Sequence, residues 1–368
     1  MKKRVLAMVL ALGMTFGLAG CAGSDKATDT SDKKAESADT ESKDELTTVK
    51  WNYGSSGNVL VTIAEEEGYF EDEGIKIEPV EATQNMDAMA LLAAGKVDVV
   101  SNAGTSNPLQ QIAQGVDLTI FGGHMVEGCM PVIAKAGTEW NGIESFIGES
   151  VAVNPSYFAF TGAVMDLGYD NPLDVVDWKV YSSYDDALVA VQNGEVKYAL
   201  MGTQNNYGVK QLVDSGDIEI VSYQSEIMEN YSCCRMVGQT KWVNDNPDTV
   251  KAIIRALLRA QSWYEANKEE AVSLHAKRIG QEDDYVAAYM MDDKHYFVNV
   301  DPLKNSVVRA WNILDKTGYL GDDCKIDIED HINTELYEEA LAEATKSYGD
   351  EAPDFYEAQQ KFFDENDK

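Results

Sequence analysis

Histidine and cysteine are scarce in this chain of 368 residues, which contains 4 histidines and 5 cysteines. No two histidines lie at the spacing of a metal-binding motif, so we expect no metal site and no cofactor. The Gly-x-Ser-x-Gly, His-Glu-x-x-His and phosphate-loop motifs are also missing from the sequence. The sequence therefore predicts a protein with no catalytic residues, which is not an enzyme.

Basic residues are also few. The chain has 30 lysines and arginines against 63 aspartates and glutamates, and its net charge is −33. Such a surface repels nucleic acid and anionic lipid headgroups, so we expect neither as a partner. The charge says little about a ligand, because backbone N–H groups can make a binding site locally positive.

The N-terminus has the pattern of an export signal. Residues 2–4 are basic, residues 5–18 are apolar, and residues 18–21 read LAGC. The apolar run is shorter than the roughly 20 residues of a membrane span, and the pattern predicts a signal peptide over residues 1–20. Because Cys21 follows small residues, the site resembles the lipobox of bacterial lipoproteins. This resemblance implies lipidation of Cys21, with palmitate among the acyl groups, and a lipid anchor in the cell membrane.

Residues 21–45 combine the expected lipidated cysteine with a polar linker. Beyond Cys21 the segment has no aromatic residue and no apolar periodicity. It cannot bury enough apolar surface to offset the entropy of ordering, so we expect a disordered tether on the outer face of the membrane.

Residues 46–368 have the pattern of an α/β body that is too long for one core, and we expect two lobes. Strands are predicted at 48–53, 75–80, 97–100, 117–121, 132–135, 150–154, 178–181, 196–201 and 218–223. Helices are predicted at 59–67, 85–94, 105–114, 158–166, 184–193 and 205–214, and then at 269–279, 283–292, 302–316 and 333–346. A further long helix should begin at residues 246–248, which read NPD. This alternation favours mixed sheets flanked by helices, with a helical C-terminal third.

Four cysteines lie in this body, at positions 129, 233, 234 and 324. An even number outside the cytoplasm permits disulfides, but the sequence does not give their pairing. The alternatives are buried free thiols, or a bridge from Cys129 to Cys233 or Cys234.

Four segments resemble the solute-binding proteins of bacterial ABC importers. They read GNVLVTIAEEEGYFEDEGI at 57–75, MALLAAGKVDVV at 89–100, IAQGVDL at 112–118 and ALVAVQNGEV at 187–196. More narrowly, they resemble the group that binds sulfonates, nitrate, taurine and thiamine-precursor pyrimidines. Residues 197–199 depart from the group's pattern, because they read KYA where many relatives place Asp-Ala.

The resemblance implies a two-lobed periplasmic-binding-protein-like fold (type II). Lobe I would comprise residues 46–125 and 233–368, and lobe II residues 126–232. Two crossover hinge segments would lie near residues 124–130 and 226–234. The implied function is capture of a sulfonate, nitrate-like anion or pyrimidine between the lobes, and delivery to an ABC permease by a monomeric protein. The alternatives are a lipoprotein sensor or scaffold without a transport role, or a pyrimidine-synthesis-like enzyme on the same fold.

Candidate ligand-binding residues lie in the loops that follow strands, where helix N-termini offer free N–H groups. These residues are Ser55, Ser56, Asn58, Asn85, Ser101, Asn102, Thr105, Asn154, Ser156, Tyr157, Thr203 and Gln204. Helix capping alone would also explain such residues. Aromatic candidates for a stacking wall are Trp51, Tyr53, Tyr157, Phe158, Tyr184 and Tyr207, and Arg235 is a candidate partner for an anion.

Overall fold

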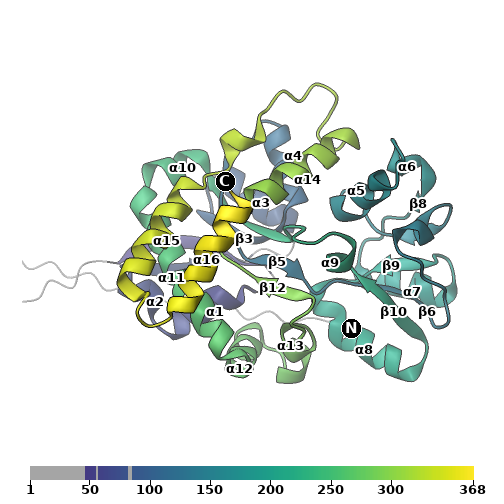
Figure 1. The fold of residues 1–368 in the computed structure, drawn as a ribbon, viewed down its shortest axis with the longest axis horizontal. Coiled ribbons are helices and arrows are strands. Elements are labelled where there is room, and N and C mark those ends of the chain that lie inside the picture. Colours follow the sequence, from purple (N-terminus) through teal and green to yellow (C-terminus); the bar gives the residue numbers. More distant parts are fainter. Residues whose placement is uncertain (1–45, 55–56, 82–84) are drawn as a thin grey trace, which may run out of the picture. The chain divides into compact units, whose positions relative to one another are not determined.

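A computed structural model describes residues 46–54, 57–81 and 85–368 (Figure 1). Its first sheet has the strand order β2-β1-β3-β11-β4. The strands are β1 (Thr47–Asn52), β2 (Ile75–Pro79), β3 (Val99–Gly104), β4 (Leu118–Gly123) and β11 (Cys234–Gln239). β1 is parallel to β2 and β3, whereas β11 is antiparallel to both β3 and β4. The predicted mixed sheet is therefore present.

The second sheet has the strand order β10-β6-β9-β7-β8. Its strands are β6 (Pro131–Lys135), β7 (Ser150–Ala152), β8 (Asp177–Trp178), β9 (Tyr198–Leu200) and β10 (Ile218–Tyr223). A third, two-stranded sheet pairs β5 (Met125–Gly128) with β12 (Tyr296–Val298). The chain crosses from the first sheet to the second through β5 and returns between β10 and β11.

Helices cover both large sheets, and most of the C-terminal ones lie beside the first sheet (Figure 1). The helices up to the return segment are α1 (Val59–Glu66), α2 (Tyr69–Asp72), α3 (Asn85–Ala93), α4 (Ser106–Ala113), α5 (Phe158–Asp166), α6 (Pro172–Val175), α7 (Tyr184–Asn193), α8 (Asn206–Ser215) and α9 (Gln224–Ile227). The later ones are α10 (Thr240–Asp245), α11 (Pro247–Ala266), α12 (Lys268–Ile279), α13 (Asp283–Met290), α14 (Lys304–Lys316), α15 (Glu335–Tyr348) and α16 (Pro353–Asn366). Three short 3-10 helices are η1 (Ile143–Phe146), η2 (Thr203–Asn205) and η3 (Ile328–His331).

Helix α11 shows how the sequence pattern becomes core packing. It begins at Pro247, as the residues at 246–248 predict. Val250, Ile253 and Leu257 recur at helical spacing and are at most 1% exposed. Burying each such side chain contributes roughly 1.5–3 kcal/mol, which fixes α11 against α1 and α15.

Several boundaries differ from the sequence prediction. The predicted strand at 97–100 continues to Gly104, so residues expected in a loop belong to β3. β11 and α16 were not predicted at all, and β8 has only two residues. β11 was missed because its CRMVGQ sequence contains an arginine and a glycine in place of a regular apolar alternation.

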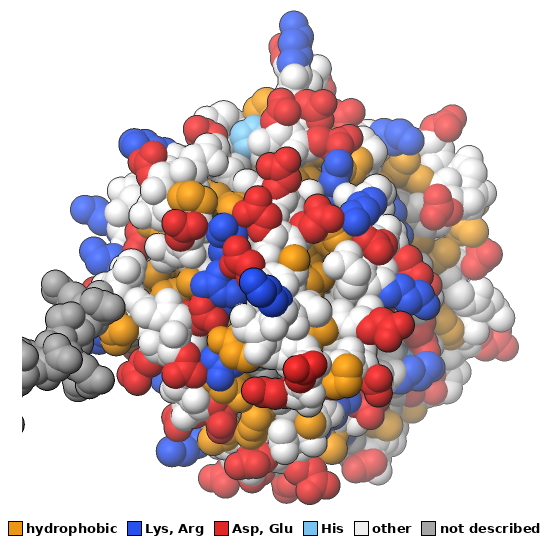
Figure 2. All heavy atoms as spheres, turned by 60° about the vertical axis from the view of Figure 1, so that its left-hand side comes forward, with side chains coloured by type: hydrophobic (Ala, Val, Ile, Leu, Met, Phe, Trp, Pro, Cys, Tyr) orange, Lys and Arg blue, Asp and Glu red, His pale blue; other side chains and the backbone are white. Residues whose placement is uncertain are grey.

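The predicted N-terminal features lie outside the described residues, including the signal peptide at 1–20, the lipidated Cys21 and the linker to residue 45. Within residues 46–54, 57–81 and 85–368, no helix is both long enough and apolar enough to cross a membrane. The surface of this part carries acidic groups over much of the face in Figure 2, with basic side chains between them.

A buried histidine next to the first crossover gives the fold a predictable response to acid. His124 is 2% exposed, and neither of its ring nitrogens has a hydrogen-bond partner among the described residues. Burial, with smaller effects of His275 and Arg235, lowers the pKa of His124 to about 3. The unfolded chain takes up a proton near pH 6.5 and the folded chain does not. Stability attributable to His124 is therefore complete above pH 6.5 and is lost progressively as the pH falls toward 3.

Because of His124, we expect the free energy of unfolding to fall by about 3 kcal/mol between pH 7 and pH 4. Urea unfolding at a series of pH values measures the loss. The substitution His124→Leu replaces the imidazole by a side chain of similar volume that does not titrate. The unfolding free energy of this variant should depend less steeply on pH, by up to the slope that the uptake of one proton gives. Identical pH profiles for the two proteins would show that His124 does not titrate in this way.

Candidate functional site

A cavity of about 220 Å³ lies between the first and second sheets and next to both crossover segments. A cavity of this size suits a compact small molecule. The lining residues are Asn102, Gly104, Thr105, Ser106, Asn107, Met125, Met130, Asn154, Ser156, Tyr157, Phe158, Tyr184, Gly202, Thr203, Gln204, Gln224, Tyr231, Ser232, Cys233 and Cys234.

The end of β3 and the start of α4 provide one side of the cavity. Asn102 is 6% exposed, and its amide donates to the carbonyl of Gly57 at 2.8 Å. Thr105 follows, with its hydroxyl donating to the carbonyl oxygen of Ser232 and lying 3.0 Å from the Ser232 hydroxyl. The Ser106 hydroxyl donates to the carbonyl of Ser156 at 2.6 Å. These bonds connect the first sheet both to the return crossover and to the loop before α5.

The loop between β7 and α5 provides the opposite side. The Asn154 side chain accepts a bond from the Ser156 amide at 3.0 Å, which fixes the turn that presents Tyr157. The hydroxyl groups of Tyr157 and Tyr184 are 3.0 Å apart, so the two rings form one hydrogen-bonded pair. Burial raises the pKa of both hydroxyls, which keeps them protonated and neutral at physiological pH. The pair can therefore offer aromatic surface and hydroxyl groups to a ligand.

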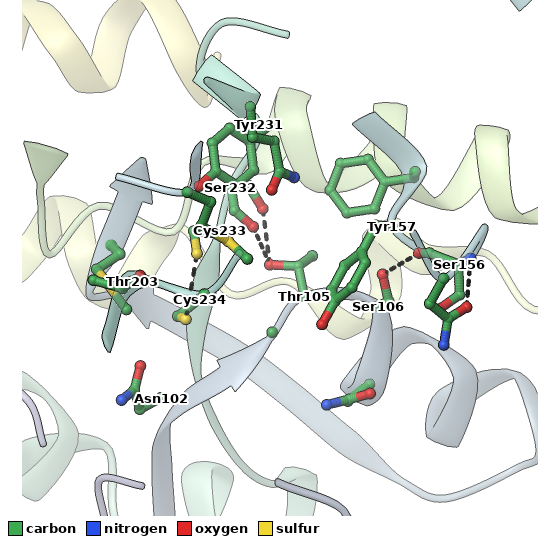
Figure 3. A pocket seen from close by; sticks show the side chains of 18 of the residues that line it. Asn102, Thr105, Ser106, Ser156, Tyr157, Thr203, Tyr231, Ser232, Cys233 and Cys234 are labelled. Carbon is green, nitrogen blue, oxygen red and sulfur yellow. Dashed lines mark hydrogen bonds between the residues drawn. The ribbon is translucent and has the colours of Figure 1, made fainter. Parts of the chain in front are cut away.

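The crossover segments close the cavity between these sides. The Tyr231 hydroxyl accepts a bond from the Gly128 amide at 2.7 Å, and the Thr203 hydroxyl donates to the Gly128 carbonyl. A Cβ atom at Gly128 would lie 2.8 Å from the sulfur of Cys233, so this close approach requires glycine. Figure 3 shows Tyr231, Ser232, Cys233 and Thr105 grouped on this side of the cavity.

The charge of the cavity lining bears on which ligands fit. Among the described residues, no lysine, arginine, histidine, aspartate or glutamate lines it. Hydroxyl, amide, thiol and aromatic groups provide its polar surface. In the same part of the chain, no group of three or more histidine, cysteine, aspartate or glutamate residues could hold a metal ion. The lining fits an uncharged ligand with several hydrogen-bonding atoms, because a bare ion would be desolvated without an opposite charge nearby.

The structure brings together seven of the twelve candidate ligand-binding residues as lining residues of this cavity. They are Asn102, Thr105, Asn154, Ser156, Tyr157, Thr203 and Gln204. Asn58 and Ser101 do not line it: Asn58 caps α1, and the Ser101 hydroxyl accepts bonds from Trp51 at 2.8 Å and Asn58 at 3.1 Å. Ser55 and Ser56 lie outside the described residues, as does the side chain of Asn85.

The aromatic candidates and Arg235 also differ in whether they line the cavity. Tyr157, Phe158 and Tyr184 line the cavity, whereas Trp51, Tyr53 and Tyr207 do not. Trp51 is fully buried in the core of the first sheet. The expectation of Arg235 as an anion partner is wrong, because its guanidinium is fully buried and donates to the carbonyls of Asp301 and Met125 at 2.7 and 2.9 Å.

The crossover residues are not among the ligand-binding residues predicted from the sequence. Tyr231, Ser232 and Cys233 reach the cavity because the returning chain passes between the sheets before it enters β11, and Cys234 is the first residue of that strand. The sequence feature that could have identified these residues is the predicted crossover at 226–234. Segments that join two lobes must pass the space between the lobes, where the ligand is expected. All four cysteines of the described residues are free thiols, so the bridge considered for Cys129 is not formed.

Comparison with known proteins gives matches of two kinds. The family model described as NMT1/THI5 like matches residues 58–271, which is more than half of the chain. The 4-amino-5-hydroxymethyl-2-methylpyrimidine phosphate synthase of Schizosaccharomyces pombe is 24% identical over 211 residues, or 54% of this chain. The match covers 59% of that synthase, so the chain spans about three fifths of the length of this curated relative.

Solved structures share the fold. The periplasmic aliphatic sulphonate binding protein SsuA from Escherichia coli superposes with a TM-score of 0.65 at 16% identity, over 79% of this chain and 99% of SsuA. The periplasmic nitrate-binding protein NrtA from Synechocystis PCC 6803 gives a TM-score of 0.61 at 17% identity, over 81% of this chain and 89% of NrtA. The two-lobed periplasmic-binding-protein fold predicted from the sequence is therefore confirmed.

The comparisons also correct one expectation. The sequence predicts a protein that is not an enzyme, and the curated relative named as a synthase contradicts this prediction. The missing motifs belong to hydrolases, metalloproteases and phosphate-binding loops, so they carry no information on other kinds of catalysis.

Proposed function

This chain is a member of the NMT1/THI5-like family, and we propose that it binds a neutral pyrimidine in the cavity between its two sheets. The observation that carries the proposal is the lining of that cavity, which is uncharged among the described residues and contains paired tyrosines. A pyrimidine ring offers a flat aromatic face to tyrosine, and its ring nitrogens and substituents can exchange hydrogen bonds with hydroxyls and amides.

Sulfonates and nitrate fit this lining less well. The chain has a net charge of −33, and none of the described cavity residues provides a compensating cation. The N-termini of α4 and α5 face the cavity through Ser106 and Phe158 and provide a partial positive charge. That partial charge suits electron-rich ring nitrogens without the desolvation cost of a full ionic charge.

The proposal also covers how the protein closes on its ligand, where it lies and what it delivers the ligand to. Residues 46–125 with 233–368 form one lobe and residues 126–232 the other, and the lobes close on the ligand by a hinge motion. The protein lies outside the cytoplasm, is held at the membrane by a lipid on Cys21, and delivers its ligand as a monomer to ABC permease subunits. The fold shared with periplasmic sulphonate- and nitrate-binding proteins supports this role.

A thermal-shift comparison tests the choice of ligand. The compounds are 4-amino-5-hydroxymethyl-2-methylpyrimidine, taurine and sodium nitrate, with sodium chloride added to equalise ionic strength. A ligand at 100 times its dissociation constant stabilises the fold by about 2.7 kcal/mol, so the pyrimidine should raise the melting temperature by several degrees. Taurine and nitrate should give no more than the sodium chloride control. A larger shift with either anion would overturn the proposal.

The name of the curated relative favours a second function, formation of a pyrimidine phosphate. Among the described lining residues, the half-buried thiol of Cys233 is suited to covalent chemistry, because its pKa is lowered, chiefly by its hydrogen bond with Cys234. Release of a pyrimidine phosphate by the purified chain, lost in Cys233→Ser, would support synthesis. Stoichiometric binding without product formation would favour the transport role.

A further inference from the structure

Two adjacent cysteines in the cavity lining have an uncommon arrangement. Neighbouring residues of an extended chain normally point to opposite faces. The sulfur atoms of Cys233 and Cys234 are nevertheless only 3.7 Å apart, and both residues line the cavity. Ser232, just before them, has a φ of +60°, a left-handed conformation that few non-glycine residues adopt. Figure 3 shows both sulfur atoms on the same side of the chain, joined by the hydrogen bond.

The two thiols differ in chemistry. The Cys234 thiol donates to the sulfur of Cys233, and this bond is the largest cause of the lowered pKa of Cys233. The same bond and burial raise the pKa of Cys234 well above its usual value. The thiolate is the nucleophilic form of cysteine, so Cys233 is the attacking member and Cys234 the resolving member of the pair.

We propose that Cys233 and Cys234 form a reversible disulfide within the ligand cavity, with a small-molecule disulfide as the oxidant. The Cys233 thiolate attacks one sulfur of the oxidant, forms a mixed disulfide and releases the first thiolate of the oxidant. Cys234 then loses its proton and attacks the Cys233 sulfur, which expels the second thiolate. The two protons of the protein thiols end on the two released thiolates. The protein pair is thereby oxidised, and the oxidant is reduced to two thiols.

Closing this bond must change the shape of the cavity. The sulfur atoms have to approach from 3.7 Å to about 2.0 Å. The Cα atoms of adjacent residues are about 3.8 Å apart, closer than in most disulfides, so the backbone from Ser232 to Cys234 has to adjust. Thr105 is bonded to that segment through its hydroxyl to Ser232 and through its amide, which donates to the Cys233 carbonyl at 3.0 Å. Oxidation therefore weakens the bonds that connect β3 to the return crossover. A strained disulfide of this kind is readily reduced again.

The other two thiols of the described residues provide internal comparisons. Cys129 is buried, and desolvation is the main cause that raises the pKa of its thiol to about 12. Its sulfur contacts Asn206 at 3.6 Å and Asp292 at 3.8 Å. Cys324 is half-buried and packs beside the core that includes Leu320 and Ile328. Neither lines the cavity, so neither should compete for the oxidant as Cys233 does.

The first experiment locates the bond by mass spectrometry. The full chain with Cys21→Ser is reduced, exposed to oxidised glutathione, digested and compared with the reduced protein. We expect the peptide that contains both Cys233 and Cys234 to become lighter by about 2 Da and to lose two titratable thiols. This change should be absent in Cys233→Ser and in Cys234→Ser, and unaltered in Cys324→Ser. A bridge that includes Cys129 or Cys324, a lasting glutathione adduct or unchanged thiols would each overturn the proposal.

The second experiment tests the effect on the cavity without any ligand. Hydrogen exchange is followed in a peptide that covers Thr105, with the chain reduced and oxidised. Because the Thr105 amide bonds to Cys233, its exchange should be at least fivefold faster after oxidation, and reduction should restore the slow rate. A peptide from the middle of α11 serves as the control and should not change. Equal exchange at Thr105 in both states would show that the disulfide leaves the cavity unaltered.

Discussion

Tyr157→Ala is expected to weaken binding of 4-amino-5-hydroxymethyl-2-methylpyrimidine by 10- to 100-fold. Tyr157 lines the cavity and shares a 3.0 Å hydroxyl contact with Tyr184. Stacking of a base on an aromatic side chain contributes about 1–3 kcal/mol when measured by substitution with alanine. The same substitution also leaves the Tyr184 hydroxyl, on the same side of the cavity, without its partner. Isothermal titration calorimetry measures the loss of affinity.

Two variants separate the ring from other effects. Tyr157→Phe retains the aromatic face and removes one hydrogen bond, so it should lose no more than about tenfold in affinity. Tyr169→Ala removes a tyrosine that follows α5, is 37% exposed and does not line the cavity, and this variant should bind as the parent does. If Tyr157→Ala bound the pyrimidine as tightly as Tyr169→Ala, the cavity would not be the binding site.

Arg235→Met is expected to lower the free energy of unfolding by about 3–5 kcal/mol. The Arg235 guanidinium is fully buried and donates to the carbonyls of Asp301 in one segment and Met125 in β5. It also lies near Asp301 and Asp367, whose carboxyl pKa values are raised, chiefly by burial. Removing the guanidinium leaves two carbonyls without these donors and a buried acidic pair without its nearby cation.

Urea unfolding of the parent and the variant at pH 7 measures this effect. The control is Lys241→Met, which removes the exposed ion pair with Asp245 and should change stability by less than about 1 kcal/mol. Since Arg235 does not line the cavity, the variant should still bind the pyrimidine where it remains folded. Equal stabilities for the two variants would show that the buried guanidinium is replaceable by an apolar chain.

The regular elements of the fold were predictable because their residues repeat at short spacing. The NPD sequence at 246–248 predicts the start of α11, and Val250, Ile253 and Leu257 recur at helical spacing along it. β11 has no such pattern, because it contains Arg235 and Gly238. These two residues suit the strand only because of their contacts with residues distant in sequence. Gly238 lies close to Val243 and Phe121, and Arg235 bonds to Asp301 and Met125.

The cavity was partly predictable for a related reason. Thr105, Asn154 and Thr203 lie at the ends of strands, and strand ends are where ligands bind in α/β proteins. Tyr231 and Cys233 belong to a segment whose place depends on the return of the chain to the first sheet. The sequence also does not reveal that Ser101 is turned into the core, because its bonds to Trp51 and Asn58 exist only in the folded chain.

Calorimetric titration of the full chain measures whether the cavity selects a neutral pyrimidine over an anion. The titrants are 4-amino-5-hydroxymethyl-2-methylpyrimidine and taurine, each at low and high sodium chloride. We expect saturable binding of the pyrimidine with one site per chain and an affinity that changes little with salt, since no ionic pair forms. Taurine should give no measurable heat. Tight binding of taurine that weakens with salt, together with no binding of the pyrimidine, would show that the cavity selects an anion.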